Sequence, residues 1–236
     1  GGHEHFMLKE IFEQPARLRD TVRQGSVKDD AFGVAAAQVF PQVAAVQILA
    51  CGTSYHAGLV ARHWIESLAE LPCQVEVASE YRYRESVTLP NTLVVGISQS
   101  GETADTLAAL EHVDPERVLA RLAICNVDHS AMVRVSELVY LTQAGIEIGV
   151  ASTKAFTTQL AALLNLTLCL ARHHAEGVLS GHEVAASLEE MADAAGAVLE
   201  YDARIKALSH HFTNKHHALF LGRGIYYPIA MEGALK

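Results

Sequence analysis

Apolar runs alternate with amphipathic segments along the first two thirds of the chain. The runs are five to seven residues long and apolar almost throughout, which is typical of strands that a parallel sheet buries on both faces. Segments between them, such as 55–70 and the residues after Ala104, have helical spacing. We therefore predict an α/β fold, a doubly wound parallel sheet with flanking helices, with strands at 45–50, 74–78, 92–98, 121–127 and 138–142.

The segments around this sheet are predicted to be mainly helical. Segment 4–24 is amphipathic, and Pro15 is expected to kink or split it. Segment 153–172 is apolar on most sides, which predicts a helix that is buried in the chain or between subunits. Further helices are predicted near Ala35, at 181–200, at 202–212 and from about Tyr227 onward.

A weak internal repeat predicts how the chain is divided. Segments 48–55 and 219–226 both pass from an apolar run through a glycine-containing turn towards a helix. The second segment predicts a sixth strand at 218–221 and a second α/β module starting near His217. The expected parts are an N-terminal helical segment, a first subdomain, a helical connector and the truncated beginning of a second subdomain, at 1–44, 45–172, 173–216 and 217–236.

Composition and charge narrow the class of protein. A formal net charge of −9 argues against a nucleic-acid surface and against binding to an acidic membrane. No apolar run reaches bilayer length, so no membrane span is predicted. The four cysteines lie far apart with no zinc spacing, which predicts reduced thiols and a cytoplasmic protein. Adjacent histidines do not share a helix face, so we predict neither a metal nor any other cofactor.

The loop from Ser98 to Thr103 carries the strongest chemical signal. It contains hydroxyl and amide side chains, including Ser98, Gln99, Ser100 and Thr103, between a predicted strand and a predicted helix. A helix N-terminus binds anions because its first N–H groups lack partners and its dipole is positive. The loop holds no lysine or arginine, which favours a small phosphate ester over a nucleotide triphosphate.

Two observations leave this interpretation open. Ser100 and Thr103 could be helix caps and nothing more. Glu102 suits a helix N-terminus as a structural acid, but it would repel phosphate if it pointed inward.

Other polar positions are expected near the same edge of the sheet. Thr53 and Ser54 follow the first strand, and right-handed crossovers place them beside the 98–103 loop at the carboxyl ends of the strands. After the fifth strand, Gly145 and Gly149 make a flexible approach to the long apolar helix, which Ser152 or Thr153 can cap.

Glu232 and Lys236 lie one helical turn apart near the end of the chain. At this spacing they form either an ordinary helix ion pair, worth a few tenths of a kcal/mol, or an acid and an amine beside a sugar-phosphate site. The second role would require them to lie within hydrogen-bonding reach of a proton that is transferred.

Taken together, these motifs resemble the isomerase (SIS) domain of bacterial glucosamine-6-phosphate synthases, the glutamine–fructose-6-phosphate aminotransferases. The resemblance covers nearly the whole chain and implies the SIS fold with flavodoxin-like strand order. The four motifs that carry it are CGTSY at 51–55, SQSGETADTL at 98–107, EIGVASTKAFTTQ at 147–159, and LGRG at 221–224 with EGALK at 232–236.

The resemblance also implies roles for individual residues. Ser98, Gln99, Ser100 and Thr103 match the loop that holds the phosphate of fructose 6-phosphate or glucosamine 6-phosphate, with Thr53 and Ser54 at the same pocket. Val150 and Ser152 match a stretch that contacts the sugar, and Glu232 and Lys236 match the isomerising site, as its catalytic residues. The family is dimeric, so a homodimer is expected.

The resemblance further implies that the chain is an incomplete enzyme. In the family, a glutamate one turn beyond the position of Lys236 is the base, a histidine of the partner subunit opens the ring, and a glutaminase domain supplies ammonia. These parts have no match in the sequence. We therefore expect sugar-phosphate binding without glucosamine 6-phosphate synthesis, with Lys236 frayed, solvated and protonated at neutral pH.

Two other functions compete with this hypothesis. A non-enzymatic SIS module that senses a sugar phosphate in a regulator should carry a basic helix-turn-helix segment, and this chain is acidic. Another SIS isomerase or a deglycase is disfavoured by the long match at 147–159.

Overall fold

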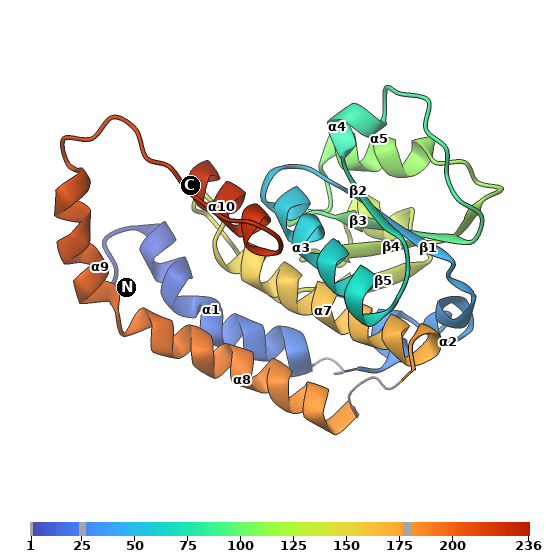
Figure 1. The fold of residues 1–236 in the computed structure, drawn as a ribbon, viewed down its shortest axis with the longest axis horizontal. Coiled ribbons are helices and arrows are strands. Elements are labelled where there is room, and N and C mark those ends of the chain that lie inside the picture. The colour runs from blue at the N-terminus through green and yellow to red at the C-terminus, as the bar shows by residue number, and fades with distance from the viewer. Residues whose placement is uncertain (1, 24–26, 177–180) are drawn as a thin grey trace.

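A five-stranded parallel sheet forms the centre of the described structure (Figure 1). The computed structural model describes residues 2–23, 27–176 and 181–236. The strands follow the order β2-β1-β3-β4-β5, which steps outward in both directions from β1 and confirms the doubly wound prediction. Their bounds are β1 Ala45–Ala50, β2 Cys73–Val77, β3 Thr92–Ile97, β4 Val118–Cys125 and β5 Leu138–Leu141.

The strands end nearly level with one another. Ala50 of β1 pairs with Val77 of β2 on one side and with Ile97 of β3 on the other. Ile97 pairs in turn with Ile124 of β4. This register brings the loops that leave the carboxyl ends together at one edge, so segments distant in sequence become neighbours there.

Helices cover both faces of the sheet because successive strand residues point in opposite directions. On one face, residues such as Ile48 and Val95 share a core with the larger helices, while Leu49 and Val94 belong to the core on the other face. The larger layer contains α1 Phe6–Arg23, α2 Ala36–Val39, α3 Gly52–Leu68, α7 Lys154–His174 and α8 Gly181–Leu199, with 3-10 turns η1 Asp29–Phe32 and η2 Phe40–Gln42. The smaller layer contains α4 Ala78–Tyr81, α5 Ala104–His112 and α6 Ala131–Arg134.

Helix α7 is buried inside the chain, where it packs between α1 and α3. The prediction that no segment could span a membrane was too strict, because α7 has 21 residues and a mean hydropathy of 1.2. However, 78% of its apolar window is buried within this chain, which is the position of a core helix. Its apolar character therefore needs no partner subunit to explain it.

The C-terminal part reaches away from the sheet and then returns (Figure 1). Helix α9 Asp202–Ser209 and the turn η3 His210–Phe212 have no buried residues, whereas α10 Tyr226–Leu235 packs back against α3. The predicted sixth strand at 218–221 is wrong. No described strand pairs with this segment, and Leu219 and Leu221 are 89% and 88% exposed. A strand needs a hydrogen-bonded neighbour, and apolar composition does not supply one.

The remaining differences are local. Helix α1 continues through Pro15, which does not split it. Helices α4 and α6 were not predicted, because four residues are too few for a helical pattern to emerge. The predicted end of the first helix at Gln24, and residues 177–180 of the predicted connector, lie outside the described residues.

Candidate functional site

Three helices begin at the edge where the strands end. Helix α3 follows β1 directly, α5 follows β3 after the 98–103 loop, and α7 follows the loop from Gln143 to Thr153. Each helix start contributes backbone N–H groups that have no partner within the helix, together with the positive end of its dipole. Such an edge favours negative charge through backbone groups alone.

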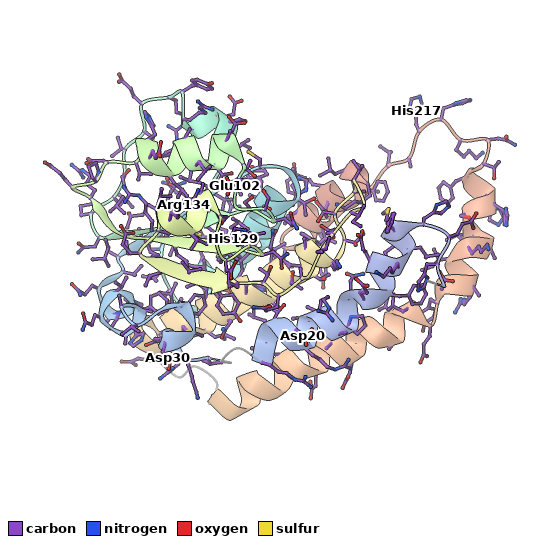
Figure 2. All side chains as sticks on the ribbon, turned by 180° about the vertical axis from the view of Figure 1, so that it is seen from behind. Asp20, Asp30, Glu102, His129, Arg134 and His217 are labelled. Atoms are coloured by element: carbon purple, nitrogen blue, oxygen red, sulfur yellow. The ribbon has the colours of Figure 1, made fainter. Side chains whose placement is uncertain are left out.

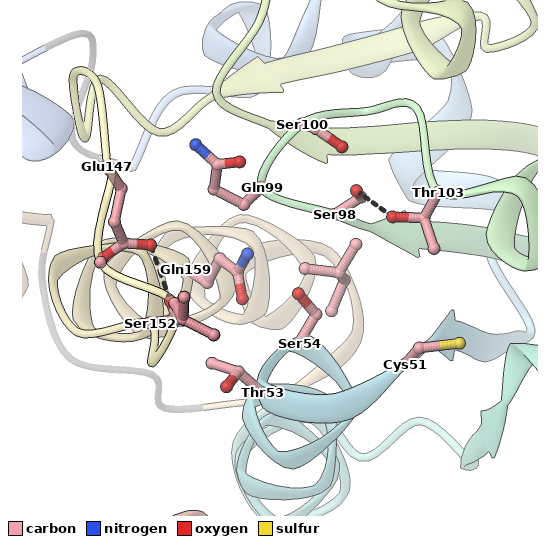
Figure 3. Close-up of a pocket in the computed structure, with 13 residues that line it drawn as sticks. Cys51, Thr53, Ser54, Ser98, Gln99, Ser100, Thr103, Glu147, Ser152 and Gln159 are labelled. Carbon is pink, nitrogen blue, oxygen red and sulfur yellow. Dashed lines mark hydrogen bonds between the residues drawn. The ribbon is translucent and has the colours of Figure 1, made fainter. Parts of the chain in front are cut away.

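A pocket of about 280 Å³ lies between these helix starts (Figure 3). This volume is close to the lower limit of about 300 Å³ for ligand pockets, so the pocket suits a small ligand. Its lining contains no lysine and no arginine among the described residues, and Glu147 is its acid. The lining residues are Cys51, Thr53, Ser54, Ile97, Ser98, Gln99, Ser100, Thr103, Glu147, Gly149, Val150, Ser152 and Gln159.

The pocket brings together the residues that the sequence predicted for the binding of a sugar phosphate. Thr53, Ser54, Ser98, Gln99, Ser100, Thr103, Val150 and Ser152 all line it. Cys51, Glu147 and Gln159 line it as well and were not predicted as site residues. For Gln159 the sequence held a signal, because it is an uncharged polar residue in a helix that is otherwise mostly apolar.

Hydroxyl groups hold the 98–103 loop in shape. The Ser98 hydroxyl accepts a hydrogen bond of 3.1 Å from the Gly101 N–H and lies 2.8 Å from the Thr103 hydroxyl (Figure 3). Thr103 occupies the N-cap position of α5, but its side chain makes no capping bond. Ser98 therefore stabilises the loop from within, and the Thr103 hydroxyl bonds to Ser98 and does not cap the helix.

Several N–H groups of this edge stay without an acceptor. Within the described ranges, the backbone N–H groups of Gln99, Ser100 and Thr103 donate to no protein atom, and neither do those of Thr53 and Ser54 at the start of α3. These donors border the pocket from two sides. The arrangement can hold the oxygens of an anion without a cationic side chain.

Glycine is required at position 101, and Glu102 faces away from the pocket. Gly101 has a φ of +67°, and a Cβ there would overlap the Ser130 side chain. Glu102 accepts a hydrogen bond of 2.7 Å from the Ala131 N–H, the first residue of α6. Figure 2 shows Glu102 in the neighbourhood of His129 and Arg134, outside the pocket lining. Its charge therefore does not oppose an anion in the pocket.

The start of α7 already carries a negative charge. The Glu147 carboxylate accepts hydrogen bonds of 2.8 Å from the Thr153 N–H, 3.3 Å from the Ala155 N–H and 2.9 Å from the Ser152 hydroxyl. Thr153 occupies the N-cap position of α7, as predicted, but its side chain makes no capping hydrogen bond. The Glu147 carboxylate from the preceding loop is the stronger acceptor and binds the N–H groups instead. The α7 end of the pocket thus has its N–H donors at Thr153 and Ala155 occupied by Glu147, whereas the donors at the starts of α3 and α5 have no protein acceptor among the described residues.

Helix α1 supports the loop that precedes α7 through two carboxylates. Glu10 is buried and accepts hydrogen bonds of 2.5 Å from the Ile148 N–H and 3.2 Å from the Gly149 N–H. Glu13 pairs at 2.7 Å with the ammonium of Lys154, whose side chain is 3% exposed and also donates to the Ile146 carbonyl at 2.6 Å. The hydrogen bond from Lys154 lowers the pKa of Glu13 below its ordinary value.

Glu232 and Lys236 lie beside the pocket and reach it through Thr53. The Thr53 hydroxyl donates to Glu232 at 2.9 Å and accepts from the Lys236 ammonium at 3.1 Å, while the two charged groups pair at 2.5 Å. Glu232 Oε2 also lies 2.7 Å from His56 Nδ1. Both residues are buried, with Glu232 5% and His56 8% exposed. Lys236 is exposed as expected, but the expectation that it is frayed is wrong, because this long-range contact with α3 holds its side chain.

No group of three or more metal-binding side chains occurs among the residues that the structure describes. The four cysteines are free thiols. Burial raises the pKa of Cys73 and Cys125, and it raises that of Cys169 to about 12, so these three thiols are unreactive core residues.

Comparisons with known proteins give a family and named relatives. Residues 42–168 match the SIS domain. The chain is 56% identical over 240 residues to a Bordetella pertussis protein named glutamine--fructose-6-phosphate aminotransferase [isomerizing]. That alignment covers 100% of this chain and 39% of the relative, so the chain spans about two fifths of the relative's length.

Solved structures agree with this match. The C-terminal domain of glucosamine-fructose-6-phosphate aminotransferase from Francisella tularensis superposes with a TM-score of 0.92 at 46% identity, over 99% of this chain and 67% of that chain. A tagatose-6-phosphate ketose/aldose isomerase from Escherichia coli gives a TM-score of 0.67 at 17% identity, over 98% of this chain and 63% of that chain, and shares the fold alone.

The Glu13–Lys154 pair predicts a pH-dependent contribution to stability. Glu13→Gln should lower the free energy of unfolding at pH 7 by about 1–3 kcal/mol, because it removes the charged acceptor of a buried ammonium. The folded pKa of Glu13 lies below its ordinary value of 4.5, so its contribution is complete above about pH 5. It should be lost as the pH falls through the folded pKa.

Urea unfolding at pH 7, 5, 4 and 3 would measure this effect. The difference between wild type and Glu13→Gln should shrink below about pH 4.5. Glu111→Gln is the matched control, because Glu111 on α5 is exposed and makes no ion pair among the described residues. A wild-type advantage that stays constant down to pH 3 would contradict the assigned role of Glu13.

Proposed function

The chain belongs to the SIS domain family, and from this membership we propose that it is the sugar-phosphate-binding part of a glutamine–fructose-6-phosphate aminotransferase. It is homologous to the isomerase domain of those enzymes. We propose fructose 6-phosphate and glucosamine 6-phosphate as its ligands. The observation that carries the proposal is the pocket itself, which combines two helix starts and free N–H groups with a polar end at α7 whose N–H groups Glu147 occupies.

The two ends of the pocket suggest how such a ligand lies. A phosphate needs donors, and the loop at Ser100 and Thr103 and the start of α3 at Ser54 offer N–H and hydroxyl groups. The start of α7 is less favourable for phosphate, because Glu147 already accepts from its N–H groups. The sugar hydroxyls then extend toward Val150 and Ser152, which also line the pocket.

Glu232 and Lys236 supply the acid–base groups in this proposal. Both side chains bond to the hydroxyl of Thr53, which lines the pocket, and this keeps a carboxylate and an ammonium next to it. Proton transfer between the first two sugar carbons requires such groups close to the reacting atoms. The relatives are longer than this chain. We propose the enzyme activity and the ammonia-supplying glutaminase domain only for a protein of their full length.

A sensing role without catalysis is the second function that the sequence left open. The Glu232–Lys236–Thr53 network favours the enzyme, because phosphate binding alone does not need a buried carboxylate beside the sugar pocket. Free cysteines suit a reducing compartment, which supports a cytoplasmic location.

The division of the chain into subdomains remains part of the proposal. Segment 217–236 would open a second subdomain, with its extended residues pairing with strands that follow elsewhere. The exposed apolar side chains of Leu219 and Leu221 support this, because paired and covered strands would bury them. Residues 1–44, 45–172 and 173–216 would be the helical segment, the first subdomain and the connector.

The phosphate site is tested by removing its hydroxyl groups. Ser100→Ala with Thr103→Ala should weaken fructose 6-phosphate binding by about 10- to 30-fold, since each neutral hydrogen bond contributes about 1 kcal/mol and the N–H groups remain. Isothermal titration would measure this. Ser67→Ala, near the end of α3 and away from the pocket, is the control. Unchanged affinity in a folded double variant would refute the proposed phosphate site.

We also propose that the chain forms a homodimer through α9. Tyr201, Ile205, Leu208 and Phe212 recur at helical spacing on one side of this helix and are all more than half exposed. Every residue from Glu200 to Gly224 is exposed within the single chain. A stripe of this kind is stable in water when a second apolar surface covers it.

Sedimentation velocity at tens of micromolar should therefore show a dimer. Ile205→Asp with Leu208→Asp should shift the chain to monomer, because two charges would enter the contact. The exposed Lys206→Ala on the same helix should leave the dimer intact. A monomeric wild type, or a dimer that the double variant does not disturb, would contradict this interface.

A further inference from the structure

Gln159 is a buried polar side chain of the pocket that lacks a partner. It lies on α7, is 1% exposed, and its Oε1 accepts no hydrogen bond from any residue that the structure describes. An unsatisfied buried carbonyl destabilises the folded chain relative to a satisfied one. Helix α7 would be more stable with an apolar residue at this position, so the amide needs another explanation.

The position of Gln159 points to a ligand. Figure 3 shows its side chain between Ser152 on one side and Ser54 on the other, with Gln99 across the pocket. Other buried side chains without a partner, such as Gln47 and Thr106, do not line this pocket. Gln159 thus combines burial, an unsatisfied acceptor and a place in the lining.

The chemistry of the amide limits which group it can meet. Oε1 only accepts hydrogen bonds, and the dianionic phosphate group of a sugar phosphate also only accepts them. The group opposite Oε1 must therefore be a donor such as a hydroxyl or an amine. Because a hydroxyl both donates and accepts, it satisfies the amide in either orientation.

The surroundings of Gln159 at the α7 end of the pocket indicate what its amide can bind. Glu147 and the start of α7 already satisfy one another there, whereas the buried Oε1 of Gln159 has no donor among the described residues. We propose that Gln159 accepts a hydrogen bond from a hydroxyl of the bound sugar phosphate and thereby distinguishes a polyhydroxylated ligand from a bare phosphate. This inference rests on the proposed function, since it assumes a sugar phosphate in this pocket.

The expected energetic effect is one of specificity. A site built to bind a hydroxyl discriminates strongly against a ligand that lacks it, because the buried polar group is then left unpaired. Inorganic phosphate carries no sugar hydroxyl, so in this proposal it binds at the 98–103 loop without this contact. Loss of the Gln159 amide should therefore weaken sugar-phosphate binding and leave phosphate binding unchanged.

The test compares two ligands in three proteins. Isothermal titration measures the affinity for fructose 6-phosphate, and displacement titration measures the affinity for inorganic phosphate. Gln159→Leu should weaken the binding of fructose 6-phosphate by about tenfold and change the affinity for inorganic phosphate less than twofold. Thr157→Val is the matched control on the same helix, because it removes a hydroxyl that does not line the pocket, and it should change neither affinity. If Gln159→Leu does not fold, Gln159→Met removes the amide at similar length.

Deoxy analogues of fructose 6-phosphate complete the test. One analogue should bind wild type about tenfold more weakly than the parent sugar, and the same analogue should show no further loss in Gln159→Leu. Equal losses in both proteins for every analogue, or wild-type affinity in Gln159→Leu, would overturn the role of Gln159 while the phosphate site stands. If wild type binds no fructose 6-phosphate, the proposed function and this inference both fail.

Discussion

The site depends on one property of backbone geometry, which is that helices starting at the carboxyl edge of a parallel sheet leave N–H groups without partners. The level ends of β1 and β3 place the starts of α3 and α5 on either side of the same pocket. Cationic side chains are then unnecessary for holding an anion. The same property would attract an anion to α7, and there Glu147 occupies the N–H groups instead. In this account, the difference between the occupied start of α7 and the unoccupied starts of α3 and α5 determines at which end of the pocket an anion binds.

The loop that carries Glu147 is held by residues far away in sequence. Glu10 binds its backbone, and Glu13 pairs with Lys154 at its end, so α1 supports the α7 end of the pocket. Gly149 shows how close this contact is, since a Cβ there would lie 2.6 Å from Glu10 Oε2. At the other side, α10 approaches α3 and anchors Lys236 on Thr53. Helices α1 and α10 thus support, from outside the lining, a pocket that residues between Cys51 and Gln159 form.

The sequence predicted the features that depend on local pattern. Strands such as 92–97 were found because buried parallel strands are apolar throughout, and the 98–103 loop was found because hydroxyls cluster between a strand and a helix. What it missed depends on contacts between distant residues. Capping of α7 by Glu147 and the ordering of Lys236 by Thr53 could not be read from neighbouring residues. The sixth strand failed for the same reason, because its apolar run has no neighbouring strand among the described residues.

The most direct test is a crystal structure of this chain with fructose 6-phosphate bound. The account predicts phosphate oxygens within hydrogen-bonding distance of the hydroxyls and free N–H groups of the 98–103 loop, with the sugar extending toward Ser152 and Gln159. A phosphate bound at the start of α7 beside Glu147, or outside this pocket, would contradict the claim that unoccupied helix starts set the direction of the site.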